Sequence, residues 1–181
     1  MEFKRIQSLD SRWFDDCWRI YCDSFPLIER RELAQQIVAL QSENYTFSAI
    51  LDGDECVGVV GYWLFGGDML FVEHIAISPQ RRGGGIGGVV MEYLKEQGCE
   101  VILEIEQVVD DLTSARQRFY ERVGFVINEY NHSQPPFREG DLWLPLVVMS
   151  YPQPLSAERY NQFRLAQLNV VTLADIETCS S

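Results

Sequence analysis

Hydrophobic residues recur along this chain with two different spacings, and the change of spacing separates helices from strands. Over residues 11–25, and again over residues 28–40, they return every three or four positions, which is typical of amphipathic helices. Asp10 or Ser11 is the expected N-cap of the first helix. A short strand over residues 3–9 is expected to precede both helices.

The middle of the chain has the pattern of strands. Residues 45–51 and 56–65 are rich in β-branched and aromatic side chains and flank a polar turn, so they predict a hairpin. A second turn, at Gly66 and Gly67, leads to a strand over residues 69–77. Three consecutive antiparallel strands are therefore expected.

A helix and a further strand follow a cluster of glycines. The helical stripe ends near Gly98, and residues 100–107 form a mostly apolar strand. A strand–helix–strand unit places its two strands side by side and parallel. The remaining expected elements are a helix over 112–124, strands over 125–130 and 142–151 joined by a polar loop over 132–141, and a terminal helix over 156–168 capped by Ser156. We expect the tail after Thr172 to be disordered.

These elements predict a mixed α/β (α+β) fold. Its sheet should be largely antiparallel, with about six or seven strands, a central parallel pair, flanking helices and an extra C-terminal helix. We expect residues 1–151 to form the domain, and residues 152–181 to form a helix and tail packed on it or trailing from it.

Composition narrows the classes of function. The formal charge of −12, from 27 acidic and 15 basic residues, argues against binding to nucleic acid, which requires clustered cations. It favours the approach of an amine cation, or it simply keeps the protein soluble. The chain has no apolar run long enough for a membrane span and no secretory signal at its start, so we expect a cytoplasmic protein without a membrane partner. With five scattered cysteines and two histidines, no metal site is expected.

The glycine cluster contains the most specific chemistry. Gly83, Gly85 and Gly88 match the GxGxxG pattern, so one alternative is a dinucleotide enzyme with Glu104 or Glu106 binding the ribose. The context argues against it, because that pattern follows its strand almost directly and opens a doubly wound sheet. What the glycines do predict is a tight turn whose N–H groups converge on phosphate oxygens at the start of a helix.

Two motifs together carry a family resemblance. Arg82-Gly83-Gly84-Gly85-Ile86-Gly87 is followed, one strand later, by a helix ending in Tyr120-x-x-x-Gly124-Phe125, and this pair resembles the GNAT superfamily of N-acetyltransferases. The resemblance covers roughly residues 3–151. Residues 109–114 lack the asparagine that many relatives carry there, and Gly84 stands where a larger, often basic, residue is common.

The resemblance implies acetyl-CoA as cosubstrate, held where the two parallel strands splay apart. Backbone groups of Ile75, Ala76 and Ile77 are expected to pair with the pantetheine arm. The diphosphate would lie against Arg82, Gly83, Gly84, Gly85, Ile86, Gly87 and Gly88. Arg116 either reaches a cofactor phosphate or is a solvated helix residue.

Transfer to an amine requires proton movements at both ends. Glu73 is the expected general base, with His74, placed on the opposite face by strand alternation, as the fallback. Glu104 and Glu106 are further alternatives, and Tyr120 is the expected proton donor to the departing thiolate. The acceptor pocket is expected at the first helices and the loop after His132.

The expected activity is therefore acetylation of a primary amine, on a small molecule, peptide or protein, by direct attack in a ternary complex. The alternative is a non-catalytic acyl-CoA-binding regulatory module, and a homodimer is left open.

Overall fold

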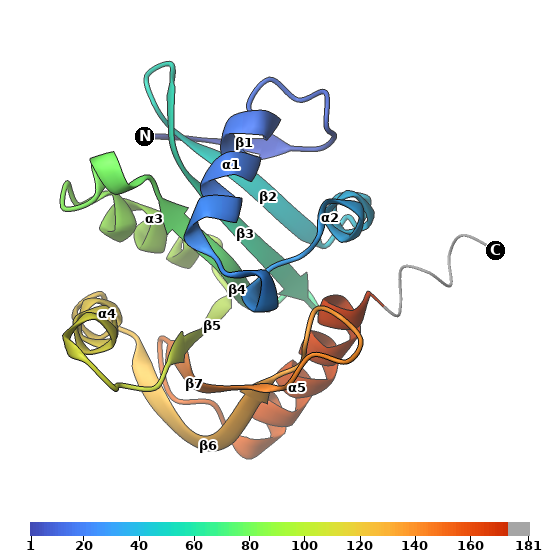
Figure 1. The fold of residues 1–181 in the computed structure, drawn as a ribbon. Helices are drawn as coiled ribbons and strands as arrows, with labels where there is room; N and C mark the ends of the chain where they lie inside the picture. Colours follow the sequence, from blue (N-terminus) through green and yellow to red (C-terminus); the bar gives the residue numbers. More distant parts are fainter. Residues whose placement is uncertain (174–181) are drawn as a thin grey trace.

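A seven-stranded sheet in the order β1-β2-β3-β4-β5-β7-β6 organises the protein, as Figure 1 shows. The computed structural model describes residues 1–173. The strands are β1 (Glu2–Ile6), β2 (Tyr45–Asp52), β3 (Glu55–Phe65), β4 (Met69–Ile77), β5 (Glu100–Glu106), β6 (Val126–Gln134) and β7 (Leu144–Tyr151). The helices are α1 (Phe14–Ser24), α2 (Leu33–Leu40), α3 (Ile86–Lys95), α4 (Asp111–Arg122) and α5 (Ala157–Thr172), with short 3-10 turns η1 (Leu27–Glu29) and η2 (Pro79–Arg81).

The predicted fold class is confirmed. β4 and β5 pair in parallel through α3, and every other neighbouring pair in the sheet is antiparallel. In Figure 1, α1, α2 and α3 lie beside the half of the sheet that ends with β4, while α4 and α5 lie beside the half that begins with β5. The one parallel pair therefore joins two halves of the molecule.

Alternation along the strands sends side chains into two separate cores, one on each face of the sheet. Phe47, Trp63 and Phe71 pack on one face with residues of α1 and α5. Leu70 and Leu103 pack on the other face with residues of α3 and α4. Since every helix stripe finds a strand face, the hydrophobic pattern alone accounts for most of the architecture.

Several predicted boundaries were wrong, each for a local reason. The residue that caps α1 is Trp13, without a side-chain bond, because the Ser11 hydroxyl instead accepts hydrogen bonds from the N–H groups of two preceding residues. The second helix starts later than expected, at Leu33, where Glu32 and Gln35 form a capping box. β6 continues through the predicted polar loop to Gln134, because this part pairs with the start of β7.

A β-bulge in β4 changes which side chains share a face. The pairing with β3 shifts so that Val72 opposes Tyr62 and His74 opposes Gly61, which leaves Glu73 as the extra residue. His74 therefore lies against Tyr21, and Glu73 accepts a hydrogen bond from Trp63. Both aromatic residues belong to the same core, so Glu73 and His74 face the same side of the sheet. The prediction that His74 points to the opposite face was wrong, because alternation is interrupted at the bulge.

The C-terminal helix packs on the sheet. Ser156 caps α5 as predicted, accepting from the N–H of Arg159, and the helix continues to Thr172. Its buried Phe163 meets Phe71 edge-to-face, with ring centroids 5.2 Å apart. In residues 1–173 no helix combines the length and apolarity that a bilayer crossing needs. The predicted disordered tail lies outside the described residues.

Candidate active site

β4 and β5 separate halfway along their length. Their pairing runs from Met69 opposite Glu100 to Val72 opposite Leu103 and stops there. Beyond that point β5 continues along β7, and β4 continues along β3. We call the space between the two diverging halves the strand gap. Within the part of the chain that the structure describes, the β4 edge from Glu73 to Ile77 has no strand partner on the β5 side, so its backbone groups can pair with an extended ligand.

The glycine-rich turn lies at the end of β4, between η2 and α3. Gly83 and Gly85 adopt left-handed conformations, with φ of 81° and 79°, and Gly85 is the N-cap of α3. A Cβ built on either glycine, or on Gly88, would meet no atom within 4 Å. The turn is therefore an open cradle at a helix N-terminus, and the unpaired N–H groups of the first helical turn suit an anion such as a diphosphate.

Gly87 has a different function from the glycines of the cradle. A Cβ on this residue would lie 3.1 Å from the ring of Phe119. The missing side chain allows α3 to approach α4 closely, which brings the turn next to the helix that carries Tyr120.

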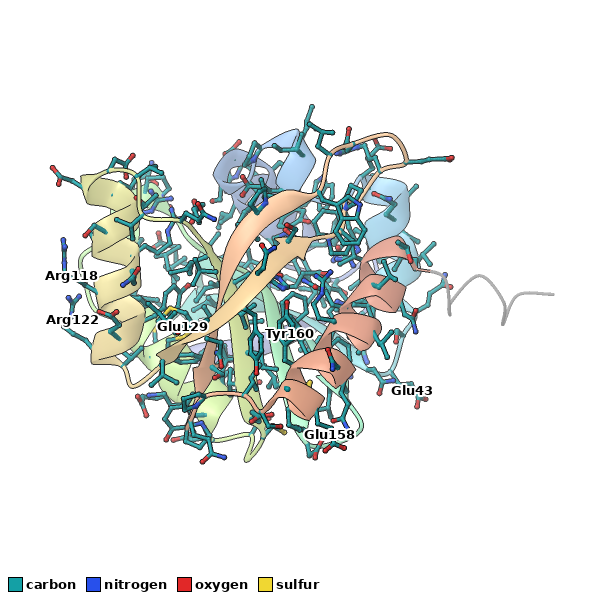
Figure 2. The ribbon with its side chains drawn as sticks, turned by 90° about the horizontal axis from the view of Figure 1, so that it is seen from below. Glu43, Arg118, Arg122, Glu129, Glu158 and Tyr160 are labelled. Carbon is teal, nitrogen blue, oxygen red and sulfur yellow. The ribbon has the colours of Figure 1, made fainter. Side chains whose placement is uncertain are left out.

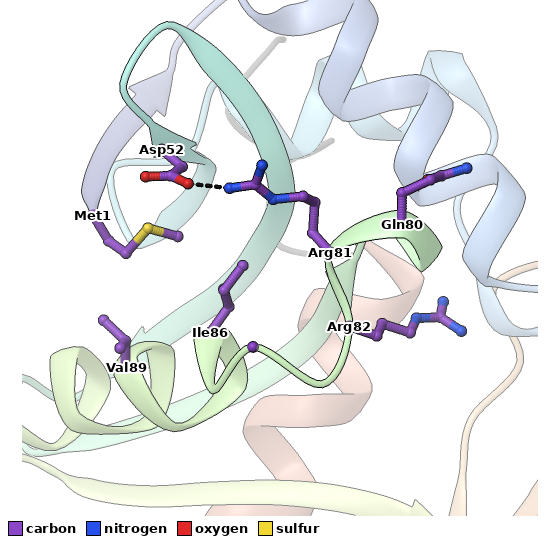
Figure 3. Close-up of a pocket in the computed structure, with 8 residues that line it drawn as sticks. Met1, Asp52, Gln80, Arg81, Arg82, Ile86 and Val89 are labelled. Carbon is purple, nitrogen blue, oxygen red and sulfur yellow. Dashed lines mark hydrogen bonds and ion pairs between the residues drawn. The ribbon is translucent and has the colours of Figure 1, made fainter.

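The two arginines before the glycines point to opposite sides of the turn (Figure 3). Arg81 forms ion pairs with Asp52 and Glu55, beside a cavity of about 510 Å³ that Gly84 also lines. Arg82 donates from Nε to the carbonyl of Ile77 at 3.0 Å. The remaining guanidinium donors of Arg82 are therefore available at the turn. The carbonyl of Ile77 already accepts a hydrogen bond and is less available to a ligand.

Tyr120 lies on α4 at the edge of the second core. Burial raises the pKa of Tyr120 to about 12; the charge of Arg116 lowers it and that of Glu106 raises it. No hydrogen bond to its hydroxyl is found among residues 1–173. The phenol is therefore protonated at neutral pH and free to donate to a ligand.

Arg116 does not extend as a free cation. It forms an ion pair with Glu106 at the end of β5, and both side chains are partly exposed, at 40% and 38%. A role at a cofactor phosphate would require Arg116 to leave this pair. The same pair occupies Glu106, one of the alternative bases.

Glu73 is fully buried and paired. Its carboxylate forms an ion pair with Arg31 and accepts a hydrogen bond from Trp63 Nε1 at 3.2 Å, and both charged side chains are 0% exposed. Burial raises the pKa of Glu73, but the charge of Arg31 and contacts with His74 outweigh it and lower the pKa to about 2. These surroundings argue against the predicted role of Glu73 as the base, because its carboxylate is weakly basic and enclosed.

Glu104 is similarly enclosed, on the neighbouring strand. It pairs with His132 and accepts a hydrogen bond from Gln167 of α5, and its side chain is 6% exposed. His132 is itself buried and also contacts the hydroxyl of Tyr160 at 3.1 Å. Neither residue is open to an acceptor, contrary to the expectation that an acceptor pocket forms at His132.

Two charged residues near the gap were missed by the sequence analysis. Arg31 lies between η1 and α2, where a lone arginine gives no signal of burial. Glu29 is on η1, and its backbone carbonyl accepts a hydrogen bond from His74 Nε2 at 2.8 Å, so the bond fixes η1 to β4 just beyond the bulge. The cues in the sequence were Pro26 and the apolar pair Leu27-Ile28 directly before Glu29, and the structure leaves both apolar side chains exposed.

A mixed sheet that opens at its parallel pair, with a glycine cradle at the adjacent helix N-terminus, defines the fold of an acyl-CoA-dependent acyltransferase. The model of the acetyltransferase (GNAT) family matches residues 11–125, and this chain belongs to that family.

Individual relatives agree with this assignment. A solved candidate acetyltransferase of the GNAT family from Bacteroides thetaiotaomicron is 32% identical, with a TM-score of 0.86 over 94% of this chain and 98% of its own. A curated candidate acetyltransferase, YjbC of Bacillus subtilis (strain 168), is 38% identical over 58 residues, which span 31% of this chain and 30% of YjbC. An aminoglycoside 6'-N-acetyltransferase solved with coenzyme A shares the fold at a TM-score of 0.60 and 16% identity, over 86% of this chain and 99% of its own.

Proposed function

We propose that this protein transfers the acetyl group of acetyl-CoA to a primary amine, by direct attack in a ternary complex. One observation carries the proposal: beyond Val72, within residues 1–173, the edge of β4 is unpaired and leads to the open glycine cradle, which packs through Gly87 against the helix that carries Tyr120. The fold relative that was solved with coenzyme A supports the choice of cosubstrate.

Two parts of coenzyme A, its diphosphate and its pantetheine arm, would bind to backbone groups of the protein. The diphosphate would accept hydrogen bonds from the N–H groups between Arg82 and Gly88 at the start of α3. The pantetheine arm would lie along Ile75 and Ala76, in the way that a strand adds to a sheet edge. The open positions at Gly83 and Gly85 fit this arrangement, since a side chain on either would occupy the space of the phosphates.

The reaction forms a C–N bond and breaks the C–S bond of the thioester. An ammonium loses one proton to become a nucleophile, and its nitrogen attacks the carbonyl carbon. When the tetrahedral intermediate collapses, the nitrogen loses a second proton and CoA leaves as the thiol. The net release is one proton per turnover.

Tyr120 is our proposed donor to the departing sulfur. A phenol with a pKa of about 12 keeps its proton at neutral pH, and the thiolate of CoA receives it as the C–S bond breaks. Solvent then restores the phenol. This role requires only the hydroxyl, so a phenylalanine in its place should bind CoA normally.

The proposal is tested by following thiol release from acetyl-CoA in the presence of a panel of primary amines, together with the thermal shift caused by CoA. We expect stabilisation by CoA and amine-dependent release of thiol. Stabilisation without release from any amine would instead identify a regulatory acyl-CoA-binding module, while stabilisation by a nicotinamide cofactor but not by CoA would overturn both. A cytoplasmic location and a homodimer stay predictions.

A further inference from the structure

Near the strand gap, one acidic side chain has no direct counter-charge in the described part of the chain. Glu29 projects from η1, and among residues 1–173 its carboxylate has no ion-pair or hydrogen-bond partner. The other three carboxylates near the gap are occupied: Glu73 by Arg31, Glu104 by His132 and Glu106 by Arg116. An unoccupied, half-buried carboxylate beside a reaction centre is available for a cationic substrate.

Hydrogen bonds from two other parts of the chain hold η1, the turn that carries Glu29. The hydrogen bond from His74 Nε2 to the Glu29 carbonyl holds η1 on β4, at the point where β4 leaves β5. The loop between β6 and β7 holds the same turn from the other side, since Arg138 bonds to the carbonyl of Leu27 and pairs with Glu32. η1 is therefore a braced turn rather than a loose loop.

The charged groups around Glu29 come from three elements. Burial raises the pKa of Glu29, the charge of Glu106 on β5 raises it further, and Arg116 on α4 and His74 on β4 lower it in part; the net direction is upward. The carboxylate is thus more basic than an ordinary glutamate and far more basic than Glu73.

Apolar side chains flank these charges. Leu27 and Ile28, directly before Glu29, are 60% and 55% exposed. Around the start of α4, which carries Arg116, Val109 and Leu112 are 80% and 68% exposed. Exposed apolar side chains grouped at a functional site are one feature of a ligand-binding groove.

We propose that Glu29 binds the ammonium group of the acceptor and takes its proton, and that this acceptor is a primary amine on an apolar aryl or alkyl group held by Leu27 and Ile28. The inference rests on the proposed acetyl transfer. In the reaction, Glu29 receives the first proton of the ammonium and returns it to solvent after turnover. His74 is a positioning residue, because it bonds to the backbone carbonyl of Glu29 and holds η1 on β4.

The test compares two polar amines, ethanolamine and the polyamine spermidine, with two amines that carry apolar groups, hexylamine and 2-phenylethylamine. We expect kcat/KM to be at least about tenfold higher for the last two than for ethanolamine, because two buried CH₂ groups contribute about 1.6 kcal/mol. Ile28→Ser should reduce this preference. Leu165→Ser, at a residue of α5 that is 69% exposed, is the matched control and should leave it unchanged.

Glu29→Gln tests the base directly. We expect kcat/KM for the preferred amine to fall by about 10²-fold. We also expect the parent to lose activity at acidic pH and the variant to lose less of its own. The affinity for CoA should not change. Glu43→Gln removes the same charge at an exposed site on the opposite side of the molecule from Arg118 and Arg122 of α4 (Figure 2), and should have full activity.

The outcomes separate the two proposals. If amines are acetylated without preference for apolar ones, or if Glu29→Gln is as active as the parent, the inference about Glu29 and the acceptor is overturned while acetyl transfer stands. If no amine releases thiol although CoA binds, both fail.

Discussion

The two sides of the strand gap carry similar charged side chains, but those on one side are buried in ion pairs and those on the other are partly exposed. On what we call the closed side, Arg31 pairs with Glu73 and His132 pairs with Glu104, all nearly or fully buried under α5. On the open side, Glu29 has no ion-pair or hydrogen-bond partner among residues 1–173, and Arg116 and Glu106 form a half-exposed pair close to Tyr120. Carboxylates and cations occur on both sides, so residue type alone does not distinguish a structural ion pair from a reactive group.

The difference follows from which elements cover each side. The α5 helix supplies the closed side with Gln167, which bonds to Glu104, and with the carbonyl of Val170, which accepts from Arg31 Nη2. No strand covers the β4 edge on the open side within residues 1–173. Charges that are buried and paired have a structural role, whereas charges left half-exposed remain available to substrates.

The largest expected effect is the loss of stability on breaking the closed side. Arg31→Met leaves the carboxylate of Glu73 buried without its cation, which should lower the free energy of unfolding by about 3–5 kcal/mol. Urea denaturation followed by tryptophan fluorescence measures this. The double variant Arg31→Met/Glu73→Leu, which leaves no unpaired charge, should recover most of the loss. A single variant as stable as the parent would show that the closed side is not structural.

The next effect concerns chemistry on the open side. Tyr120→Phe should reduce kcat by about 10²-fold, because it removes the hydroxyl that protonates the departing sulfur. The dissociation constant of CoA should stay the same. Tyr93→Phe, on the face of α3 that stacks on Phe3, is the control and should retain the parent rate. Equal rates for Tyr120→Phe and the parent would remove Tyr120 from the mechanism.

A smaller effect is expected at the glycine cradle. Gly85→Ala forces a side chain into a left-handed backbone, at a cost of about 1–2 kcal/mol, and should weaken CoA binding about tenfold. Gly84→Ala is the control, because Gly84 is not left-handed and its Cβ would meet only the carbonyl of Arg81, at 3.7 Å. Calorimetric titration with CoA compares the two; similar affinities would mean that the cradle does not bind the diphosphate.

Hydrophobic spacing was sufficient to predict the three consecutive antiparallel strands, and the strand–helix–strand order was sufficient to predict the one parallel pair. The positions of the glycine turn and Tyr120 could also be predicted, since both belong to motifs with fixed spacing. These features depend on residues that lie close together in the sequence, so the sequence alone is enough to predict them.

The sequence could not predict which carboxylate is free. Strand alternation failed at Glu73, because the bulge opposite Tyr62 and Gly61 adds a residue that no local pattern announces. The burial of Glu73 depends on Arg31, which is distant along the chain, and on the carbonyl of Val170 in α5. Glu29 was missed for the converse reason: its importance comes from its lack of a partner in the described part of the chain, which only the folded arrangement defines.

The smallest predicted effect compares Glu29 and Glu73 through pH. The pKa of Glu73 is lower in the folded protein than its ordinary value of 4.5, so its contribution to stability is present above pH 4.5 and is lost as the pH falls toward 2. The pKa of Glu29 is raised, so its ionised form disfavours folding at neutral pH, and this cost disappears as the pH falls below 4.5.

Glu29→Gln should therefore stabilise the protein by about 0.5 kcal/mol at pH 7, a size typical of partly exposed charges, and by less at pH 4. Urea denaturation of parent and variant at both pH values measures the difference, with Glu43→Gln as the control for a lost surface charge. A variant that gains stability while it loses acetylation would show that the acid on the open side is kept for catalysis at the expense of the fold. A variant less stable than its parent at pH 7 would place Glu29 with Glu73 among the structural carboxylates.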